Sequence, residues 1–134
     1  RRSGINNWEV MKKVLDKDHA VTEKLKKIAQ IAREMDKALT LGKMKKVTAL
    51  FAREWEARKA LAPSISTPHM DRLIAGAMKK GAQAAKVCGA GGGGCIAFMV
   101  PSKKRESVVL ELVRLKGQVI PFRFVQRGLR VQVI

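Results

Sequence analysis

Apolar residues recur every three or four positions through the first part of the chain, the spacing that places side chains on one face of an α-helix. The strongest run consists of Val21, Leu25, Ile28, Ala32, Met35 and Leu39. Gly42 follows this run, and glycine is a common residue just beyond a helix C-terminus. The pattern therefore predicts a long amphipathic helix that ends near Gly42.

Shorter stretches with the same spacing predict three more helices, over residues 5–15, about 43–61, and from Pro68 to near Gly81. In the helix of residues 43–61, five side chains are expected to face inward: Met44, Val47, Leu50, Phe51 and Trp55. The pair Thr67-Pro68 is typical of an N-cap followed by proline at the first helical position. Asp71 lies in the first turn of this helix, where a carboxylate interacts favourably with the helix dipole.

The spacing of apolar residues changes after Gly81. Short apolar runs over Ala82–Cys88 and Cys95–Val100 predict two buried strands, and helical spacing returns over Lys103–Leu115. Residues 118–125 and 129–134 predict a hairpin that turns at Gln126-Arg127-Gly128. The expected fold is α+β, with helices on one face of a four-stranded antiparallel, ferredoxin-like sheet. We expect a single domain over 1–134, with a helical part at about 5–80 and a β-loop-β-α-β-β part at about 82–134.

Basic residues dominate the charge of the chain. Its 134 residues carry 28 Lys and Arg against 11 Asp and Glu, a formal net charge of +17, which favours a polyanionic partner such as a nucleic acid or a phosphorylated metabolite. The lysines are spread over three helical stretches, however, and only 4% of the residues are aromatic, so bases would find few side chains to stack on. We interpret most of these lysines as a solvated helical surface and do not favour a nucleic-acid partner.

Other bulk features are those of a soluble protein. No stretch approaches the roughly 20 apolar residues that span a bilayer, and no secretory signal is visible, so we expect a cytoplasmic protein without a membrane partner. The chain begins with Arg1 rather than Met, which indicates a fragment or a processed product. His19 and His69 have no second histidine or cysteine at ligand spacing, so a metal site is not expected.

The two cysteines, Cys88 and Cys95, flank a glycine-rich segment. A tetrahedral metal site would need a second pair of ligands, which the sequence lacks. Two buried thiols on neighbouring strands in a reducing compartment are the favoured interpretation. A disulfide across the segment is left open.

That segment, KVCGAGGGGC over Lys86–Cys95, holds five of the eleven glycines. Gly89, Gly91 and Gly94 match G-x-G-x-x-G, but a dinucleotide fingerprint needs a helix after the motif, and here a strand is expected. No Gly-Lys-Ser/Thr closes a P-loop either. Consecutive glycines can still turn several N–H groups toward one concavity that holds an anion. A plain hairpin needs only one or two glycines, so we favour a phosphate-binding role.

The segment Lys86–Cys95 resembles the third signature motif of the GHMP kinases. Further segments resemble the sugar-phosphate branch of that superfamily, with the D-glycero-D-manno-heptose 7-phosphate kinases as the nearest subgroup. They are Arg2-Ser3-Gly4 with Asn7-Trp8, Glu54–Lys59, Ser64–Ser66, Gly117–Phe122 and Gly128-Leu129. The resemblance covers essentially the whole chain.

The resemblance implies that the chain is the C-terminal lobe of an ATP-dependent kinase for a sugar or sugar phosphate. The N-terminal lobe would supply the ATP-binding motif, the acidic residue that acts as base or orienter, and much of the Mg²⁺ site. No Gly-Leu-Gly-Ser-Ser pattern occurs in this chain, so the chain alone is expected to be inactive, with no catalytic or metal-binding residue of its own.

The same resemblance assigns candidate binding residues. Gly89, Ala90 and Gly91–Gly94 would line the phosphate end of the cleft, although Cys88 stands where relatives often carry Ser or Thr. Lower-ranked candidates are Arg2, Ser3 and Asn6, which would face the sugar phosphate. Lys86 is either a phosphate contact or, by preference, a surface lysine.

Two other classes of function stay open at this point. The chain could be a basic nucleic-acid-binding module, or a stand-alone regulatory domain of ferredoxin-like type. Trp8 and Trp55 are interpreted as core residues or as packing between lobes, and the hydroxyls of Ser64, Ser66 and Thr67 as turn and cap groups.

Overall fold

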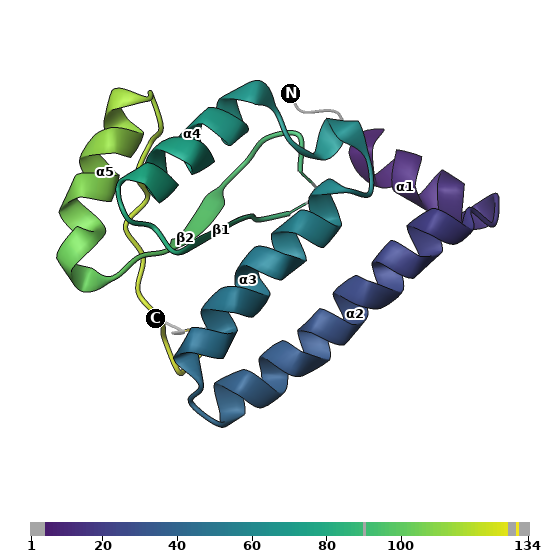
Figure 1. Ribbon diagram of the computed structural model, residues 1–134, viewed down its shortest axis with the longest axis horizontal. Coiled ribbons are helices and arrows are strands. Elements are labelled where there is room, and N and C mark those ends of the chain that lie inside the picture. Colours follow the sequence, from purple (N-terminus) through teal and green to yellow (C-terminus); the bar gives the residue numbers. More distant parts are fainter. Residues whose placement is uncertain (1–4, 90, 129–130, 132–134) are drawn as a thin grey trace.

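The computed structural model describes residues 5–89, 91–128 and 131 (Figure 1). Its elements are α1 (Ile5–Leu15), α2 (His19–Thr40), α3 (Met44–Lys59), η1 (Pro63–Ile65), α4 (Pro68–Lys79), β1 (Ala84–Val87), β2 (Ile96–Met99), η2 (Ser102–Lys104) and α5 (Arg105–Arg114). The expected order of helices and strands up to residue 115 is confirmed. None of the described helices combines the length and hydropathy needed to cross a membrane.

Helices α2 and α3 form an antiparallel hairpin along one side of the molecule (Figure 1). The turn between them contains Gly42 at φ +64°, as predicted, and Lys43 N donates to Ala38 O at 2.9 Å. Met44 was expected to face inward, but it lies beside this turn and is 54% exposed. The prediction for Met44 is wrong because the first residue of α3 lies beyond the end of the packed face.

The buried face of α2 differs from the predicted one in its second half. Ile31 and Ala38 are buried, while Ala32 and Leu39 are exposed. The buried positions are seven residues apart, and Val47, Leu50, Glu54 and Ala57 on α3 follow the same seven-residue spacing. Two helices that pack along their length favour a repeat of 3.5 residues per turn over 3.6. The partner helix thus shifts the buried stripe by one residue.

Local signals at the start of α4 are confirmed. Met70 N donates to the Thr67 hydroxyl at 3.2 Å, and Pro68 occupies the first helical position.

Between α3 and α4, the main core cluster joins five elements around Trp55, which is 3% exposed. The members of this cluster are Val21, Trp55, Leu61, Ala62, Ile65, Met70 and Val87. Trp8, in contrast, is 66% exposed on α1 and does not belong to the core.

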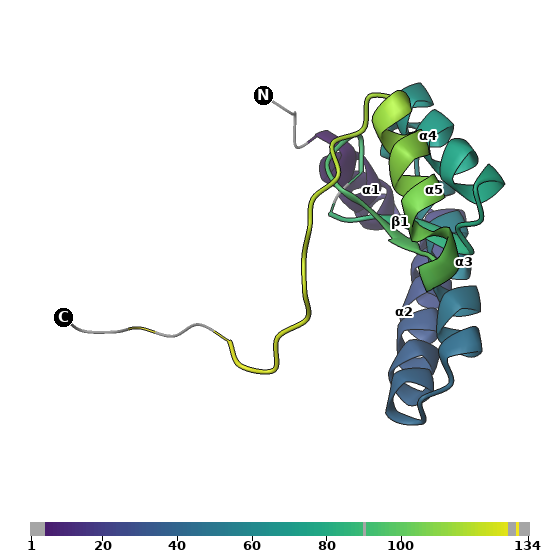
Figure 2. The same cartoon turned by 90° about the vertical axis from the view of Figure 1, so that its left-hand side faces the viewer.

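The strands β1 and β2 pair antiparallel, with Ala84 opposite Met99 and Val87 opposite Ile96. Strand β1 packs on α3, and α5 packs on α4. Helices α4 and α5 lie on one side of the β1–β2 hairpin, whereas the chain after Gly117 runs along the other side of this hairpin and away from it (Figure 2). The described residues therefore confirm an α+β fold with a two-stranded antiparallel sheet.

The four-stranded sheet is not confirmed. Residues 118–125, expected to form a strand, pair with no described strand, and Phe122 and Phe124 are 76% and 94% exposed. Alternating apolar residues permit a strand, but a strand also needs a neighbour for its ladder, and Pro121 has no N–H to donate to one. The second expected strand, 129–134, lies outside the described residues except for Val131.

Candidate functional site

The glycine-rich loop connects β1 to β2 and is closed at its base by a bond of 2.8 Å from Cys88 N to Cys95 O. Five glycines of the loop have φ in the left-handed region: Gly89 (91°), Gly91 (90°), Gly92 (69°), Gly93 (146°) and Gly94 (102°). Residues with a Cβ are strained in this region. The backbone path of the loop thus explains why so many consecutive positions are glycine.

One side of the loop packs on η1. Gly92 N donates to Ile65 O at 2.9 Å, and a Cβ at Gly91 would lie 2.6 Å from the same oxygen. Part of the glycine content therefore serves close contact between two backbone segments. The sequence did not reveal this partner, since Ile65 and Gly91 belong to different elements.

The other side of the loop is open. A Cβ at Gly89 would meet no atom within 4 Å, and both Gly89 and Gly94 are exposed. Among the described residues, the amides of Gly91, Gly93 and Gly94 donate to no backbone carbonyl. Successive backbone amides in turn conformations can converge on one anion, so these three amides are candidate donors to a phosphate group.

Lys86, just before the loop, is not the surface lysine that the sequence favoured. Its Nζ lies 2.6 Å from Oε2 of Glu54 on α3, and its side chain is only 24% exposed. Arg58 holds the other carboxylate oxygen of Glu54, with Nε 2.7 Å and Nη2 2.5 Å from Oε1. Two cations therefore surround one carboxylate that is 8% exposed, and this cluster ties β1 to α3.

Sequence analysis did not assign Glu54 and Arg58 to a site. Their separation of four residues indicates an ion pair on one helix face. The contact to Lys86 depends on tertiary packing, since 32 residues separate it from Glu54.

Two serine side chains form hydrogen bonds that hold η1, the segment on which the glycine loop packs. Ser64 Oγ donates to Glu9 Oε2 at 3.1 Å, which links η1 to α1. Ser66 Oγ donates to Asp71 at 2.8 Å, and Lys59 Nζ donates to the same carboxylate oxygen at 2.9 Å. The hydrogen bond from Lys59 holds the pKa of Asp71 below its usual range, against a smaller opposing effect of burial. These bonds hold η1 in place beneath Gly91 and Gly92.

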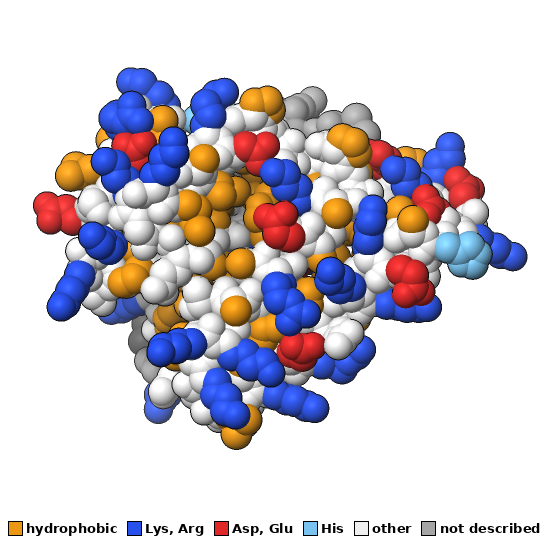
Figure 3. Space-filling model, viewed as in Figure 1, with side chains coloured by type: hydrophobic (Ala, Val, Ile, Leu, Met, Phe, Trp, Pro, Cys, Tyr) orange, Lys and Arg blue, Asp and Glu red, His pale blue; other side chains and the backbone are white. Residues whose placement is uncertain are grey.

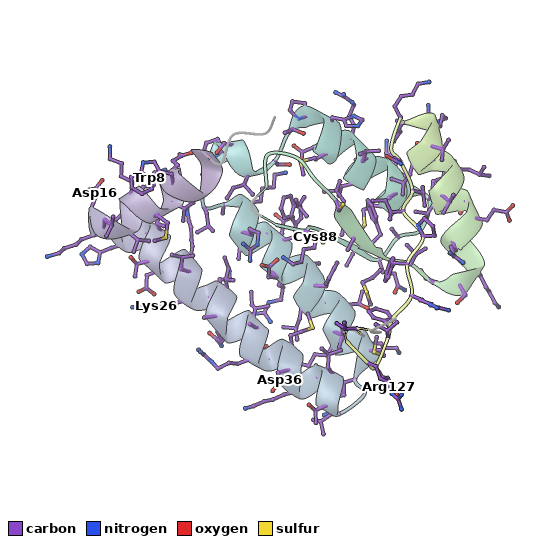
Figure 4. The ribbon with its side chains drawn as sticks, turned by 180° about the vertical axis from the view of Figure 1, so that it is seen from behind. Trp8, Asp16, Lys26, Asp36, Cys88 and Arg127 are labelled. Carbon is purple, nitrogen blue, oxygen red and sulfur yellow. The ribbon has the colours of Figure 1, made fainter. Side chains whose placement is uncertain are left out.

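The prediction that the two cysteines are buried is wrong. Both Cys88 and Cys95 are exposed free thiols rather than buried ones. Cys88 directly follows β1 and Cys95 directly precedes β2, so both lie at the base of the glycine loop. Figure 4 shows Cys88 where β1 meets the loop.

Other predicted site residues are only partly described. Arg2, Ser3 and Ala90 lie outside the described residues, and Asn6 is described as part of the α1 backbone. Over the described ranges, no group of three or more His, Cys, Asp or Glu side chains is arranged to hold a metal ion. Lys and Arg side chains are distributed over the visible face (Figure 3).

Comparison with known proteins places this geometry in a family. Residues 11–117 match the family model described as GHMP kinases C terminal. The chain is 26% identical over 113 residues to the D-glycero-alpha-D-manno-heptose 7-phosphate kinase of Campylobacter jejuni, covering 84% of this chain and 33% of that protein. It is 35% identical over 71 residues to the mevalonate kinase of Pyrococcus furiosus, covering 52% of this chain and 21% of that enzyme.

A solved structure supports the same fold. The crystal structure of L. major mevalonate kinase in complex with R-mevalonate superposes with a TM-score of 0.74 at 19% identity, over 85% of this chain and 35% of that one. The chain thus spans about a third or less of the length of these relatives. Because the family model matches most of its residues, the chain belongs to the GHMP kinase C-terminal domain family.

Proposed function

We propose that the chain is the C-terminal lobe of an ATP-dependent kinase that phosphorylates a sugar or a sugar phosphate of heptose-phosphate type. The observation that carries the proposal is the glycine loop, with its open side and amides free of described backbone partners. The similarity to a heptose 7-phosphate kinase over 84% of this chain supports the substrate class. An N-terminal lobe, in the same chain or as a separate subunit, would be the obligatory partner.

In this proposal the loop contributes one wall of the phosphate cleft. Phosphoryl transfer is catalysed mainly by positioning and by stabilising charge, and backbone amides can do both without a side chain. ATP would supply the transferred phosphoryl group. On the family resemblance, much of the Mg²⁺ site would belong to the other lobe.

The roles of the remaining candidates follow from their surroundings. Gly91 and Gly92 would hold the loop on η1, and Gly89, Ala90, Gly93 and Gly94 would face the phosphates. Lys86 would position the loop through Glu54, because its ammonium group is already paired there. Arg2, Ser3 and Asn6 would contact the sugar phosphate. We propose a cytoplasmic location and a single domain over 1–134.

Joint expression with the N-terminal lobe tests this proposal. The chain alone should not turn over ATP, whereas the two lobes together should phosphorylate a heptose or hexose phosphate. Mevalonate belongs in the same substrate panel, since two mevalonate kinases from Pyrococcus species are 35% and 36% identical over about half of this chain. Failure with every substrate by a folded two-lobe protein contradicts the proposal.

One observation favours a second candidate, binding of nucleic acid. Arg72, Lys79, Lys80 and Arg114 line a groove of about 540 Å³ between α4 and α5. Its carboxylate, Glu111, already accepts bonds of 2.9 and 2.7 Å from Arg114. Nucleic-acid binding would weaken steeply with salt and survive bulky replacements of Gly92 and Gly93. The kinase proposal predicts that those replacements abolish activity.

A further inference from the structure

The two cysteines lie directly opposite each other at the base of the glycine loop. The register of the hairpin pairs Val87 with Ile96, so the next pair along the chain is Cys88 with Cys95. The bond of 2.8 Å from Cys88 N to Cys95 O shows that this register continues to the cysteines. Residues directly opposite in an antiparallel pair place their side chains on the same face. The two thiols therefore share one face of the hairpin.

The backbone spacing of such a pair suits a disulfide. Opposite residues in antiparallel strands have Cα atoms about 4.5–5.5 Å apart, and disulfides span Cα separations of about 4.4–6.8 Å. The flanking Gly89 and Gly94 have positive φ, and no atom lies within 4 Å of a Cβ at Gly89.

Both thiols are also accessible. Cys88 and Cys95 are exposed, so a small oxidant can reach either sulfur. They are the only cysteines of the sequence, and any intramolecular disulfide of this chain must join them.

We propose that Cys88 and Cys95 form a thiol-modification site that closes reversibly to a disulfide on reaction with a low-molecular-weight disulfide such as oxidised glutathione. The thiolate of one cysteine attacks a glutathione sulfur, which breaks the S–S bond and releases one glutathione thiolate. The second cysteine then attacks the mixed disulfide and releases the other glutathione. The two protein thiols are oxidised, the glutathione disulfide is reduced, and the two protons pass to the released thiols.

The site does not depend on the proposed kinase function. Closure links the base of the loop into a ring that contains all five loop glycines. Where the loop also binds phosphate, the oxidised and reduced forms would differ in that binding. Formation of the disulfide can be measured directly, without a kinase assay.

Trypsin provides that readout, because cleavage after Lys86 and Lys103 releases one peptide that holds both cysteines. The folded protein is incubated with oxidised glutathione, remaining thiols are alkylated, and the peptide is analysed by mass spectrometry. The expected product lacks two hydrogen atoms, carries no alkyl group and no glutathione, and reverts with dithiothreitol. Cys88→Ser and Cys95→Ser serve as matched controls and should each retain one glutathione.

A synthetic peptide of residues 87–103 measures what the fold contributes. We expect the folded chain to close at least about tenfold faster than this peptide, because the hairpin holds the thiols together. Equal rates would overturn the proposal. A wild-type protein that accumulates glutathione on both cysteines, or that forms linked dimers, would overturn it as well.

Discussion

Gly91 lies in close contact with η1, and replacing it by alanine tests that contact. The new Cβ would lie 2.6 Å from Ile65 O and 2.9 Å from Ile65 Cγ2, distances that force the loop and η1 apart. A residue with a Cβ at φ +90° also carries about 1–2 kcal/mol of backbone strain. Displacing the loop would weaken the 2.9 Å bond from Gly92 N to Ile65 O, worth about 0.5–1.5 kcal/mol.

Gly89 is the matched control for this substitution. Its φ of +91° is almost the same, but a Cβ there meets no atom within 4 Å. Gly89→Ala should therefore cost only the strain, about 1–2 kcal/mol. Gly91→Ala should cost about 2–4 kcal/mol in total, from strain, steric overlap and the weakened hydrogen bond.

Urea denaturation followed by tryptophan fluorescence measures the difference, since Trp55 lies in the same core cluster as Ile65. The free energy of unfolding should fall further for Gly91→Ala than for Gly89→Ala by at least about 1 kcal/mol. Equal losses in the two variants would refute the claim that Gly91 is required for close packing on η1. The loop glycines would then be explained by backbone conformation alone.

Three further outcomes are expected. Among the described residues, Lys86→Met leaves Glu54 with Arg58 as its one charged partner, and the change should lower the free energy of unfolding by about 1–3 kcal/mol. Glu54→Met together with Lys86→Met should recover part of this loss. No recovery in urea denaturation would contradict an ion pair that is largely shielded from solvent. Because the pKa of Asp71 is lowered in the fold, its ionised form stabilises the protein above the pKa of an aspartate in the unfolded chain, about 3.9. This contribution is lost as pH falls through the lower folded-state pKa. The urea midpoint of wild type should therefore drop more between pH 6 and pH 3 than that of Asp71→Asn, and parallel profiles would contradict the expectation. Closing the eight-residue ring between Cys88 and Cys95 should stabilise the oxidised chain by about 2.5 kcal/mol on the chain-entropy model. The oxidised chain should then have a higher melting temperature than Cys88→Ser under the same oxidising conditions, and an unchanged or lower value would indicate a strained bond.

Features set by neighbouring residues could be predicted from the sequence. The cap at Thr67 and Pro68, the turn at Gly42 and the bounds of α1 depend on local hydrogen bonds and backbone angles. The strand–loop–strand setting of the glycines also follows from a change in local periodicity. These preferences act over a few residues, so one segment contains all the information that they need.

Features that depend on contacts between distant segments could not be predicted in this way. The buried stripe of α2 shifted to Ile31 and Ala38 because α3 packs along it. Lys86 became a half-buried partner of Glu54 because β1 lies on α3. The exposure of Cys88 and Cys95 depends on tertiary packing, and residues 118–125 would need a neighbouring strand that their own pattern does not provide.

The central claim is that this chain completes a kinase whose other lobe lies outside the 134 residues. It is tested most directly by measuring transfer of the γ-phosphoryl group of ATP to heptose 7-phosphate by the two lobes together, by each lobe alone, and by the two lobes with Gly93→Val in this chain. Transfer by the wild-type pair only, with loss in the Gly93→Val pair, is the predicted result. Transfer that is unchanged by Gly93→Val, or that occurs with the N-terminal lobe alone, would contradict the claim.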